Sequence, residues 1–221
     1  MERIQGKMLR GMLELPRTTP YWGIFKETGV WPIKENIIYQ RMMFLENMMN
    51  SKEERLGRMV AMEQRESGRE NSWYGETKKY ARKLNIDLHW VTEGNKEKWK
   101  KLIKERIQEK IEREAESKEQ VFRKMRHQKE QRFERKRYLR EMGIREASKT
   151  MKRRLEMNDI GNNMGKDWKC KCGEKETSEH VIKCKIGNKS EVNVDWLKET
   201  DNVDKIRRIN SLIESITKER K

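Results

Sequence analysis

All three cysteines of this 221-residue chain lie in one short stretch, as Cys170, Cys172 and Cys184, with His180 between them. Thiolate sulfur and imidazole nitrogen are the ligands from which proteins build tetrahedral zinc sites. Cys170 and Cys172 are separated by one residue, and Gly173 supplies the backbone freedom that a tight turn needs. His180 and Cys184 are four residues apart, so one helical turn directs both side chains the same way. The spacing therefore predicts that Cys170, Cys172, His180 and Cys184 hold one zinc ion.

The predicted zinc site is structural, because four protein ligands leave no open position for a substrate. Thr177 or Ser178 would cap the helical turn that carries the last two ligands. The alternative interpretation is three free thiols beside a surface histidine. Three cysteines cannot all pair within the chain, which disfavours a secreted disulfide scaffold. We therefore expect the protein in the nucleus and cytoplasm, and "MERIQGKMLRGMLEL" has no continuous apolar core that would direct secretion.

Positive charge is concentrated in the middle of the chain. The net charge is +16, and residues 96–157 contain 23 Lys and Arg against 12 Glu. Such a field attracts polyanions, and phosphates release counterions when cations neutralise them. Anionic membrane fits less well, because the polar helix faces mix both signs and no apolar run approaches the roughly 20 residues of a membrane span. We predict RNA or DNA as the partner and no membrane; a well-hydrated helix face is the competing interpretation.

The predicted phosphate contacts are the cations of the basic runs, and binding through them would be salt-sensitive and weakly sequence-specific. They are Arg123, Lys124, Arg126, Arg132, Arg135, Lys136, Arg137, Arg153 and Arg154.

Apolar residues at helical spacing predict an all-α fold around these residues. Charged residues make up 41% of the chain and hydrophobic ones 33%, which favours amphipathic helices with thin cores over one large core. Ser51 with Glu54 has the pattern of a capping box, and Asn95 and Asp201 are expected N-caps. The helix after Asn95 is expected to continue to about residue 140, with a break at Gly143. We interpret the methionine and aromatic stripes as ordinary core. The predicted helix faces are Ile4, Met8, Met12 and Leu15; Ile38, Met42, Leu45 and Met49; Trp73, Thr77, Tyr80 and Leu84; Trp99, Leu102, Ile103, Ile107 and Ile111; and Val203, Ile206, Ile209, Ile213 and Ile216.

The predicted architecture is an extended multi-helix array with a small zinc module and a C-terminal helix. Four parts follow one another along the chain: a helical region (1–92), long basic helices (93–160), the zinc-binding module (161–190) and the C-terminal helix (191–221). The boundary near Gly161 rests on the turn residues "GNNMGKDW" that precede the cysteines.

Patterns of catalytic residues are absent from the sequence. Two-metal polymerases and nucleases need carboxylates that converge on Mg²⁺, and the chain has no Asp-Asp pair. It also lacks a Walker loop and a G-x-S-x-G elbow. We therefore expect no catalysis by this chain alone.

Three segments resemble the proteins of non-LTR (LINE-type, jockey-like) retrotransposons. The segment "LELPRTTPYWGIFKETGVWPIKENIIYQRMMFLENMMNS" is similar to the region beyond the thumb of their reverse transcriptase, and "WKKLIKERI" is similar to the helix that follows. The segment "MKRRLEMNDIGNNMGKDWKCKCGEKETSEHVIKC" resembles their C-terminal Cys-Cys-His-Cys zinc motif, including its Glu-Thr-x-Glu-His run. The likeness spans nearly the whole chain, and its end motifs are the more specific ones.

This resemblance implies a role in target-primed reverse transcription. Residues 1–92 would be a post-thumb region, and together with the zinc motif they would hold element RNA, target DNA or both, beside the upstream polymerase domain. The catalytic aspartates of the family match no residue here, and no restriction-like endonuclease follows the zinc motif. The alternative function is a zinc-stabilised helical scaffold for protein interaction. An active polymerase would require a palm that these residues do not contain.

Overall fold

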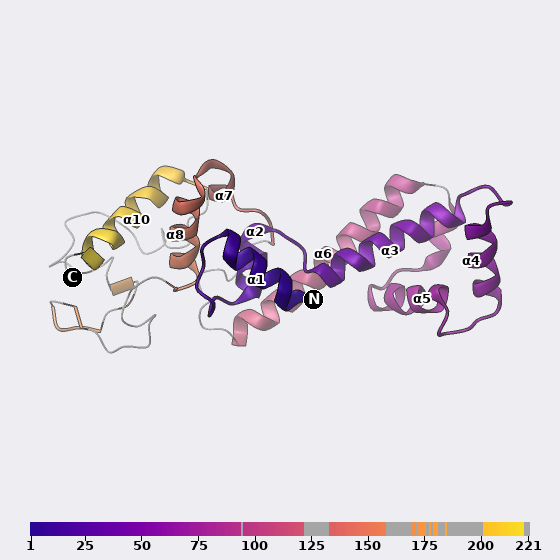
Figure 1. Ribbon diagram of the computed structural model, residues 1–221, viewed down its shortest axis with the longest axis horizontal. Helices are drawn as coiled ribbons and strands as arrows, with labels where there is room; N and C mark the ends of the chain where they lie inside the picture. Colours follow the sequence, from indigo (N-terminus) through magenta and orange to yellow (C-terminus); the bar gives the residue numbers. More distant parts are fainter. Residues whose placement is uncertain are drawn as a thin grey trace. The chain divides into compact units, whose positions relative to one another are not determined.

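The structure is a computed structural model of the chain. It describes residues 1–93, 95–121, 133–157 and 201–218 and, within the cysteine–histidine stretch, residues 169–170, 172–175, 177, 179–180 and 184. Every regular element in this described part is helical, and the only bridge between extended residues there joins Lys169 to Lys175 (Figure 1). The prediction of an all-α fold with a close Cys-Cys-His-Cys group is confirmed.

Backbone contacts divide the chain into two compact units that interleave along the sequence. Unit 1 comprises Met1–Glu2 and Trp31–Glu114, and unit 2 comprises Arg3–Val30 and Ala115–Lys221. The four consecutive parts expected from composition remain a prediction, because they divide the chain by sequence order, whereas the two units divide it by contacts.

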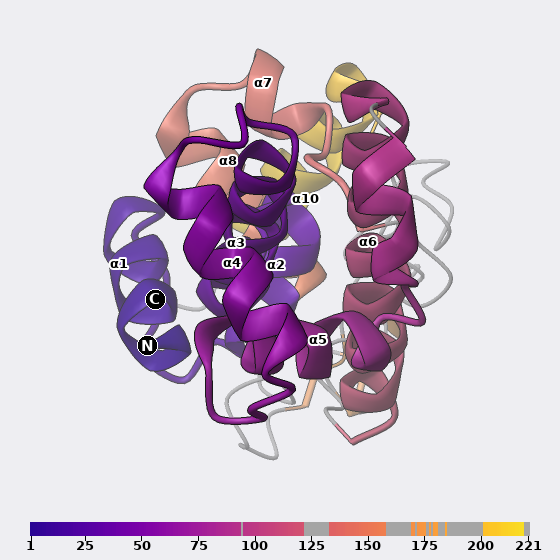
Figure 2. The same ribbon diagram turned by 90° about the vertical axis from the view of Figure 1, so that its right-hand side faces the viewer.

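Unit 1 is built on α3 (Ile33–Met49), which contacts α4 (Leu56–Glu66), α5 (Trp73–Lys83) and the 3₁₀ helix η1 (Leu88–Glu93). Figures 1 and 2 both show α4 and α5 beside α3. The α3 face predicted to be buried is buried. The same holds for Trp99, Ile103, Ile107 and Ile111 of α6 (Lys96–Val121), whose residues up to Glu114 belong to unit 1. The Trp99 indole nitrogen donates to the Met42 carbonyl at 3.2 Å, which joins the two apolar stripes.

Unit 2 contains α1 (Glu2–Met12) from Arg3 onward, α2 (Tyr21–Thr28), α7 (Tyr138–Glu141), α8 (Ile144–Arg154) and α10 (Val203–Lys218). Helix α8 contacts α7 and α10, and all three lie together in Figure 1. Their shared core includes Tyr138, Met142, Ala147 and Ile206.

Two helix starts differ from the prediction. Helix α4 begins at Leu56 without a side-chain cap, so the capping box of Ser51 and Glu54 is wrong. The Ser51 hydroxyl donates to the Met48 carbonyl at 2.7 Å instead, and so completes the end of α3. Helix α10 is capped one residue later than expected, because the Asn202 side-chain oxygen accepts from the Lys205 amide at 3.0 Å. The Asn95 cap is confirmed by its bond from the Lys98 amide at 3.0 Å.

The helix predicted from Asn95 to about residue 140 is confirmed as α6 up to Val121, its residues 122–132 lie outside the described residues, and it is wrong for residues 133–137, which are not helical. The backbone there lies against the end of α2, where the Lys136 amide donates to the Glu27 carbonyl at 3.1 Å. Gly29 makes this approach possible, because a Cβ at its φ of 64° would lie 2.3 Å from the Arg135 nitrogen. Only glycine accepts both that close contact and the left-handed backbone without strain.

No helix among the described residues is long and apolar enough to cross a membrane.

Candidate metal centre and basic surface

The structure brings together the four residues predicted to bind metal. One ligand atom from each of Cys170, Cys172, His180 and Cys184 lies within 4.8 Å of the others. The sulfurs of Cys170 and Cys184 are 3.5 Å apart, and Cys172 Sγ is 3.2 Å from His180 Nε2. Tetrahedral zinc with bonds of about 2.3 Å to sulfur would place its sulfur ligands about 3.8 Å apart. The four atoms therefore have the spacing of ligands that could share one metal ion.

A tight turn positions the first two ligands. The Cys170 amide donates to the Glu174 carbonyl, and the Gly173 amide donates to the Cys170 carbonyl, each at 2.8 Å. Gly173 has a φ of 90°, a conformation that side chains resist, and so the residue after Cys172 is constrained to be glycine. The turn thus presents Cys170 and Cys172 from the same side, as their spacing predicts.

A helical turn positions the other two ligands. The Thr177 hydroxyl accepts from the His180 amide at 3.0 Å, which confirms Thr177 as a cap. The Cys184 amide donates to the His180 carbonyl at 2.8 Å, the four-residue step of an α-helix. Cys184 is buried and the other three ligands are half-buried. Burial raises the pKa of the Cys170 thiol, and the neighbouring Cys184 thiol adds to the rise.

Glu174 completes the site without being a ligand. Its carboxylate lies 2.9 Å from His180 Nδ1, so it fixes the proton there and leaves Nε2 free to face Cys172. The spacing of the cysteines and the histidine did not predict this role for Glu174. The available signal was its place directly after the turn glycine, within reach of the histidine ligand.

The basic residues predicted to contact phosphate do not form one surface. Arg135 and Arg137 are exposed, whereas Arg123, Lys124, Arg126 and Arg132 lie outside the described residues. The prediction is corrected for three others: Lys136 is 5% exposed, Arg153 1% and Arg154 0%. Side chains enclosed in this way cannot reach a phosphate backbone.

Arg154 instead pairs with a buried carboxylate from the other end of the sequence. Its Nε lies 2.9 and 3.0 Å from the two Glu27 oxygens, and its Nη2 lies 2.9 Å from Glu27 Oε1. The Tyr138 hydroxyl donates to Glu27 Oε2 at 2.7 Å. All three side chains are fully buried, and burial raises the pKa of Tyr138 well above its usual value. The network connects α2, α7 and α8 within unit 2.

Arg153 turns toward α10 and is less completely satisfied. Its Nη1 donates to Asn210 Oδ1 at 2.9 Å, while its Nε and Nη2 have no hydrogen-bond partner among the described residues. Burial lowers its pKa to about 9, and the adjacent Arg154 charge contributes to the decrease. The basic pair at the end of α8 is therefore part of the core.

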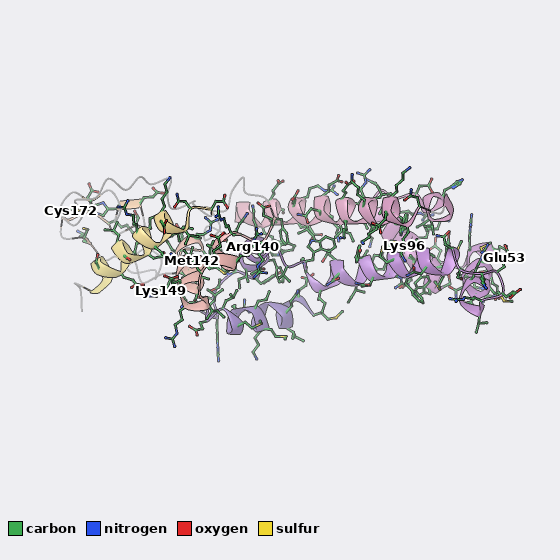
Figure 3. All side chains as sticks on the ribbon, turned by 90° about the horizontal axis from the view of Figure 1, so that it is seen from above. Glu53, Lys96, Arg140, Met142, Lys149 and Cys172 are labelled. Atoms are coloured by element: carbon green, nitrogen blue, oxygen red, sulfur yellow. The ribbon has the colours of Figure 1, made fainter. Side chains whose placement is uncertain are left out.

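The cations on the solvent side of α8 were not among the predicted phosphate contacts. Arg145 and Lys149 are exposed and Lys152 is half-buried, at positions i, i+4 and i+7 of one helix face. Lys149, which is labelled in Figure 3, forms an ion pair with Glu214 of α10 at 2.5 Å. Helical spacing could have separated this face from Ala147, Met151 and Arg154, which share the buried face. We call Arg145, Lys149 and Lys152 the α8 basic face.

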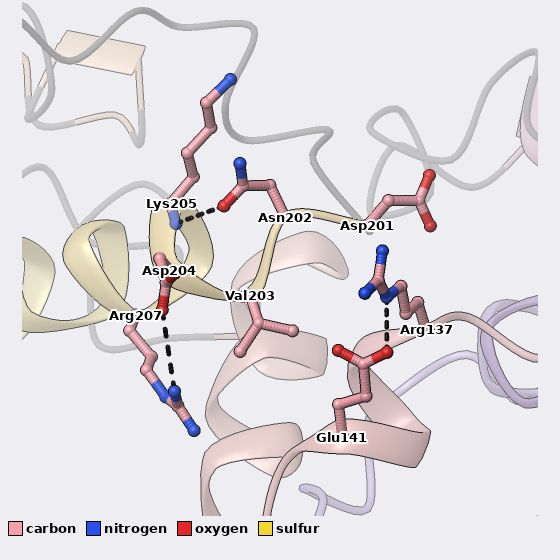
Figure 4. A pocket seen from close by; sticks show the side chains of 8 residues that line it. All are labelled: Arg137, Glu141, Asp201, Asn202, Val203, Asp204, Lys205 and Arg207. Carbon is pink, nitrogen blue, oxygen red and sulfur yellow. Dashed lines mark hydrogen bonds and ion pairs between the residues drawn. The ribbon is translucent and has the colours of Figure 1, made fainter.

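A cavity of about 690 Å³ lies at the start of α10 (Figure 4). Its charged lining is balanced, with Arg137, Lys205 and Arg207 against Glu141, Asp201 and Asp204. Figure 4 shows Arg137 paired with Glu141, and Arg207 paired with Asp204 at 3.8 Å. Because its cations are offset by carboxylates, this cavity does not select an anion.

Comparison with known proteins gives no match: no family model, no curated protein and no solved structure is significantly similar to this chain.

Proposed function

We propose that this chain is the nucleic-acid-binding C-terminal region of a non-LTR retrotransposon reverse transcriptase. It holds RNA or target DNA in place during target-primed reverse transcription, next to an upstream polymerase domain, and it does not catalyse synthesis itself. The resemblance of the segments quoted above motivates the retrotransposon assignment. The observation that carries the binding function is the distribution of charge between the two units.

Most of the net positive charge belongs to the unit that contains the metal ligands. Unit 2 has 34 Lys and Arg against 21 Asp and Glu, a net charge of +13 out of +16. Unit 1 has 19 against 16, a net +3. Because phosphates attract such a field and release counterions on binding, the excess favours nucleic acid as the ligand of unit 2. Arg135, Arg137 and the α8 basic face are the described cations that we propose as phosphate contacts.

We further propose that the metal is one structural zinc ion. A donor set of three thiolates and one imidazole suits zinc, and four protein ligands leave no position for a reacting group. The carboxylate behind His180 is the usual second partner of a histidine that binds zinc. The ion would join the tight turn of Cys170 and Cys172 to the helical turn of His180 and Cys184. It would thereby fix the positions of the surrounding lysines, Lys169 and Lys175 among them.

The α8 basic face provides the test of nucleic-acid binding. The triple substitution of Arg145, Lys149 and Lys152 by Ala should weaken duplex binding and make it less sensitive to salt. Each phosphate contact contributes about 0.9 to the slope of log K against log salt concentration, so the slope should decrease by about 2 to 3. Fluorescence anisotropy with a labelled duplex across a salt series measures both quantities.

A matched control carries the same charge change in unit 1. Lys98, Lys101 and Lys104 of α6 are exposed, and their substitution by Ala should leave the slope nearly unchanged. Equal effects of both triple variants on the slope would mean that duplex binding depends on the total charge and not on the α8 basic face. Absence of binding to mixed RNA and to duplex DNA at low salt would contradict the proposed function.

One observation favours the alternative of a protein-interaction scaffold. The α1 stripe predicted to be buried is largely in solvent, with Ile4 65%, Met8 64% and Met12 65% exposed. Helix α1 packs on α2 through its other side, where a Cβ at Gly6 would lie 2.8 Å from the Tyr21 Cβ. An exposed apolar stripe of this kind is typical of a surface that a protein partner covers. Specific loss of partner binding in a Met8→Asp variant that still binds duplex DNA would support the scaffold.

A further inference from the structure

Unit 1 carries a row of aromatic and cationic side chains that is only partly buried. The row runs between α3 and α5 and contains Phe44, Trp73, Arg41, Tyr80 and Lys83. We infer that this row is a second binding site, which takes single-stranded nucleic acid by stacking unpaired bases. The inference rests on the proposed nucleic-acid function and deepens it, because it names a strand type and a second site.

The rings are held in contact by defined geometry. The Phe44 and Trp73 ring centroids are 5.7 Å apart with planes at 88°, an edge-to-face pair. Phe44 is 55% exposed, although its neighbours Met42 and Leu45 on α3 are fully buried. Trp73 and Tyr80 are half-buried. The row therefore offers aromatic surface to solvent from rings that are already ordered.

Arg41 lies over two of these rings and is locked in place. Its guanidinium carbon is 5.1 Å from the Trp73 centroid and 5.7 Å from the Tyr80 centroid. Its Nε donates to the Thr77 hydroxyl at 2.7 Å and its Nη2 donates to the Trp73 carbonyl at 2.9 Å. Thr77 is fully buried, so these bonds anchor the cation to the interior of the unit. Arginine planes stack on bases as well as on aromatic rings.

The charge around the row favours a polyanionic ligand. Lys83 Nζ lies 5.8 Å from the Tyr80 centroid, and α5 also carries Lys78, Lys79 and Arg82. The acidic residue of α5 is Glu76, which lies 3.6 Å from Arg41. Aromatic rings with cations alongside are the combination that proteins use to bind single strands, because every base has a π face and every linkage a phosphate. A duplex hides its base faces and gains nothing from the rings.

Phe44 provides the decisive variants. We expect Phe44→Ala to weaken binding of a labelled oligo(dT) 20-mer to the full chain by about fivefold or more, the loss expected for one base stack. Binding of a 20-base-pair duplex should stay unchanged. Phe44→Leu keeps the apolar volume without a π face, so it should weaken oligo(dT) binding as much as Phe44→Ala does. Phe44→Trp should retain binding. Leu56→Ala is the matched control, because Leu56 is also in unit 1 and is 74% exposed on α4.

The outcomes separate this inference from the proposed function. If Phe44→Ala and Phe44→Leu bind oligo(dT) as the unaltered chain does, the row is not a base-stacking site, and a protein partner is the remaining use for it. The same conclusion follows if Leu56→Ala weakens oligo(dT) binding as much as Phe44→Ala does. In both cases duplex binding by unit 2 would stand. If the unaltered chain binds neither oligo(dT) nor duplex at low salt, the proposed function fails together with this inference.

Discussion

At the scale of single residues, the pairing of Glu27 with Arg154 has the largest expected effect on stability. Both charges are fully buried, and each offsets the desolvation of the other. The substitution Arg154→Met keeps the side-chain length but removes the guanidinium that offsets the buried charge of Glu27. We expect it to lower the free energy of unfolding by about 3–5 kcal/mol, measured by urea titration.

Arg145→Met on the same helix is the control for this prediction. Arg145 is exposed, so its substitution should change the free energy of unfolding by no more than about 0.5 kcal/mol. Removal of both charges, in Glu27→Gln with Arg154→Met, should cost less than the sum of the single changes, because no unpaired charge remains. A small effect of Arg154→Met alone would mean that the carboxylate is solvated and the network is not closed.

Glu174 allows a residue-scale prediction at the metal site. Its carboxylate fixes the His180 ring through Nδ1, so Glu174→Gln should weaken zinc binding by about 10- to 100-fold without changing the stoichiometry of one ion per chain. Competition with a chromophoric chelator measures the affinity. Glu179→Gln makes the same change of charge in the residue next to His180 and is the comparison. Equal affinities of the Glu174→Gln variant and the unaltered chain would show that the carboxylate does not orient the histidine.

At the scale of elements, the sequence predicted the features that depend on local spacing. It did not predict those that depend on contacts with distant segments. The buried stripes of α3 and α6 follow directly from their helical period, as does the place of His180 and Cys184 in one group of ligands. The predicted capping box at the start of α4 was wrong because the Ser51 hydroxyl bonds to the end of α3 instead. The sequence alone does not decide which of the two helices Ser51 caps. The non-helical residues 133–137 depend on Gly29, more than a hundred residues earlier, and local propensity carries no information about that approach.

The error at Arg153 and Arg154 has the same origin. A run of basic residues is usually a solvated face, and only a carboxylate buried in α2 makes burial of Arg154 favourable. Periodicity within α8 nevertheless points to the correct face. Arg145, Lys149 and Lys152 lie opposite Ala147, Met151 and Arg154 once the helix is assigned its apolar side. The position of a charge on a helix face therefore predicts its exposure better than the density of charge along the chain.

At the scale of the whole molecule, metal removal and loss of the buried ion pair should affect different parts. The amides of Gly173, His180 and Cys184 are held by bonds of the metal-binding stretch, whereas α8 and α10 pack through Ala147, Ile206 and the bond from Arg153 to Asn210. Structural zinc contributes folding free energy to the segment that binds it. Chelation should therefore accelerate hydrogen exchange in the metal-binding stretch and leave α8, α10 and α3 protected.

Arg154→Met should give the complementary pattern in the same hydrogen-exchange experiment, followed by mass spectrometry of peptides. It removes a bond that joins α2 to α8, so exchange should rise in these helices while α3 of unit 1 keeps its protection. The α3 amides are the internal reference for both treatments, since neither the metal ligands nor Arg154 belong to unit 1. Faster exchange in α3 after chelation would show that the two units unfold as one cooperative body. Protection of α3 under both treatments would instead mean that unit 1, with its aromatic row, keeps its structure when the basic unit is perturbed.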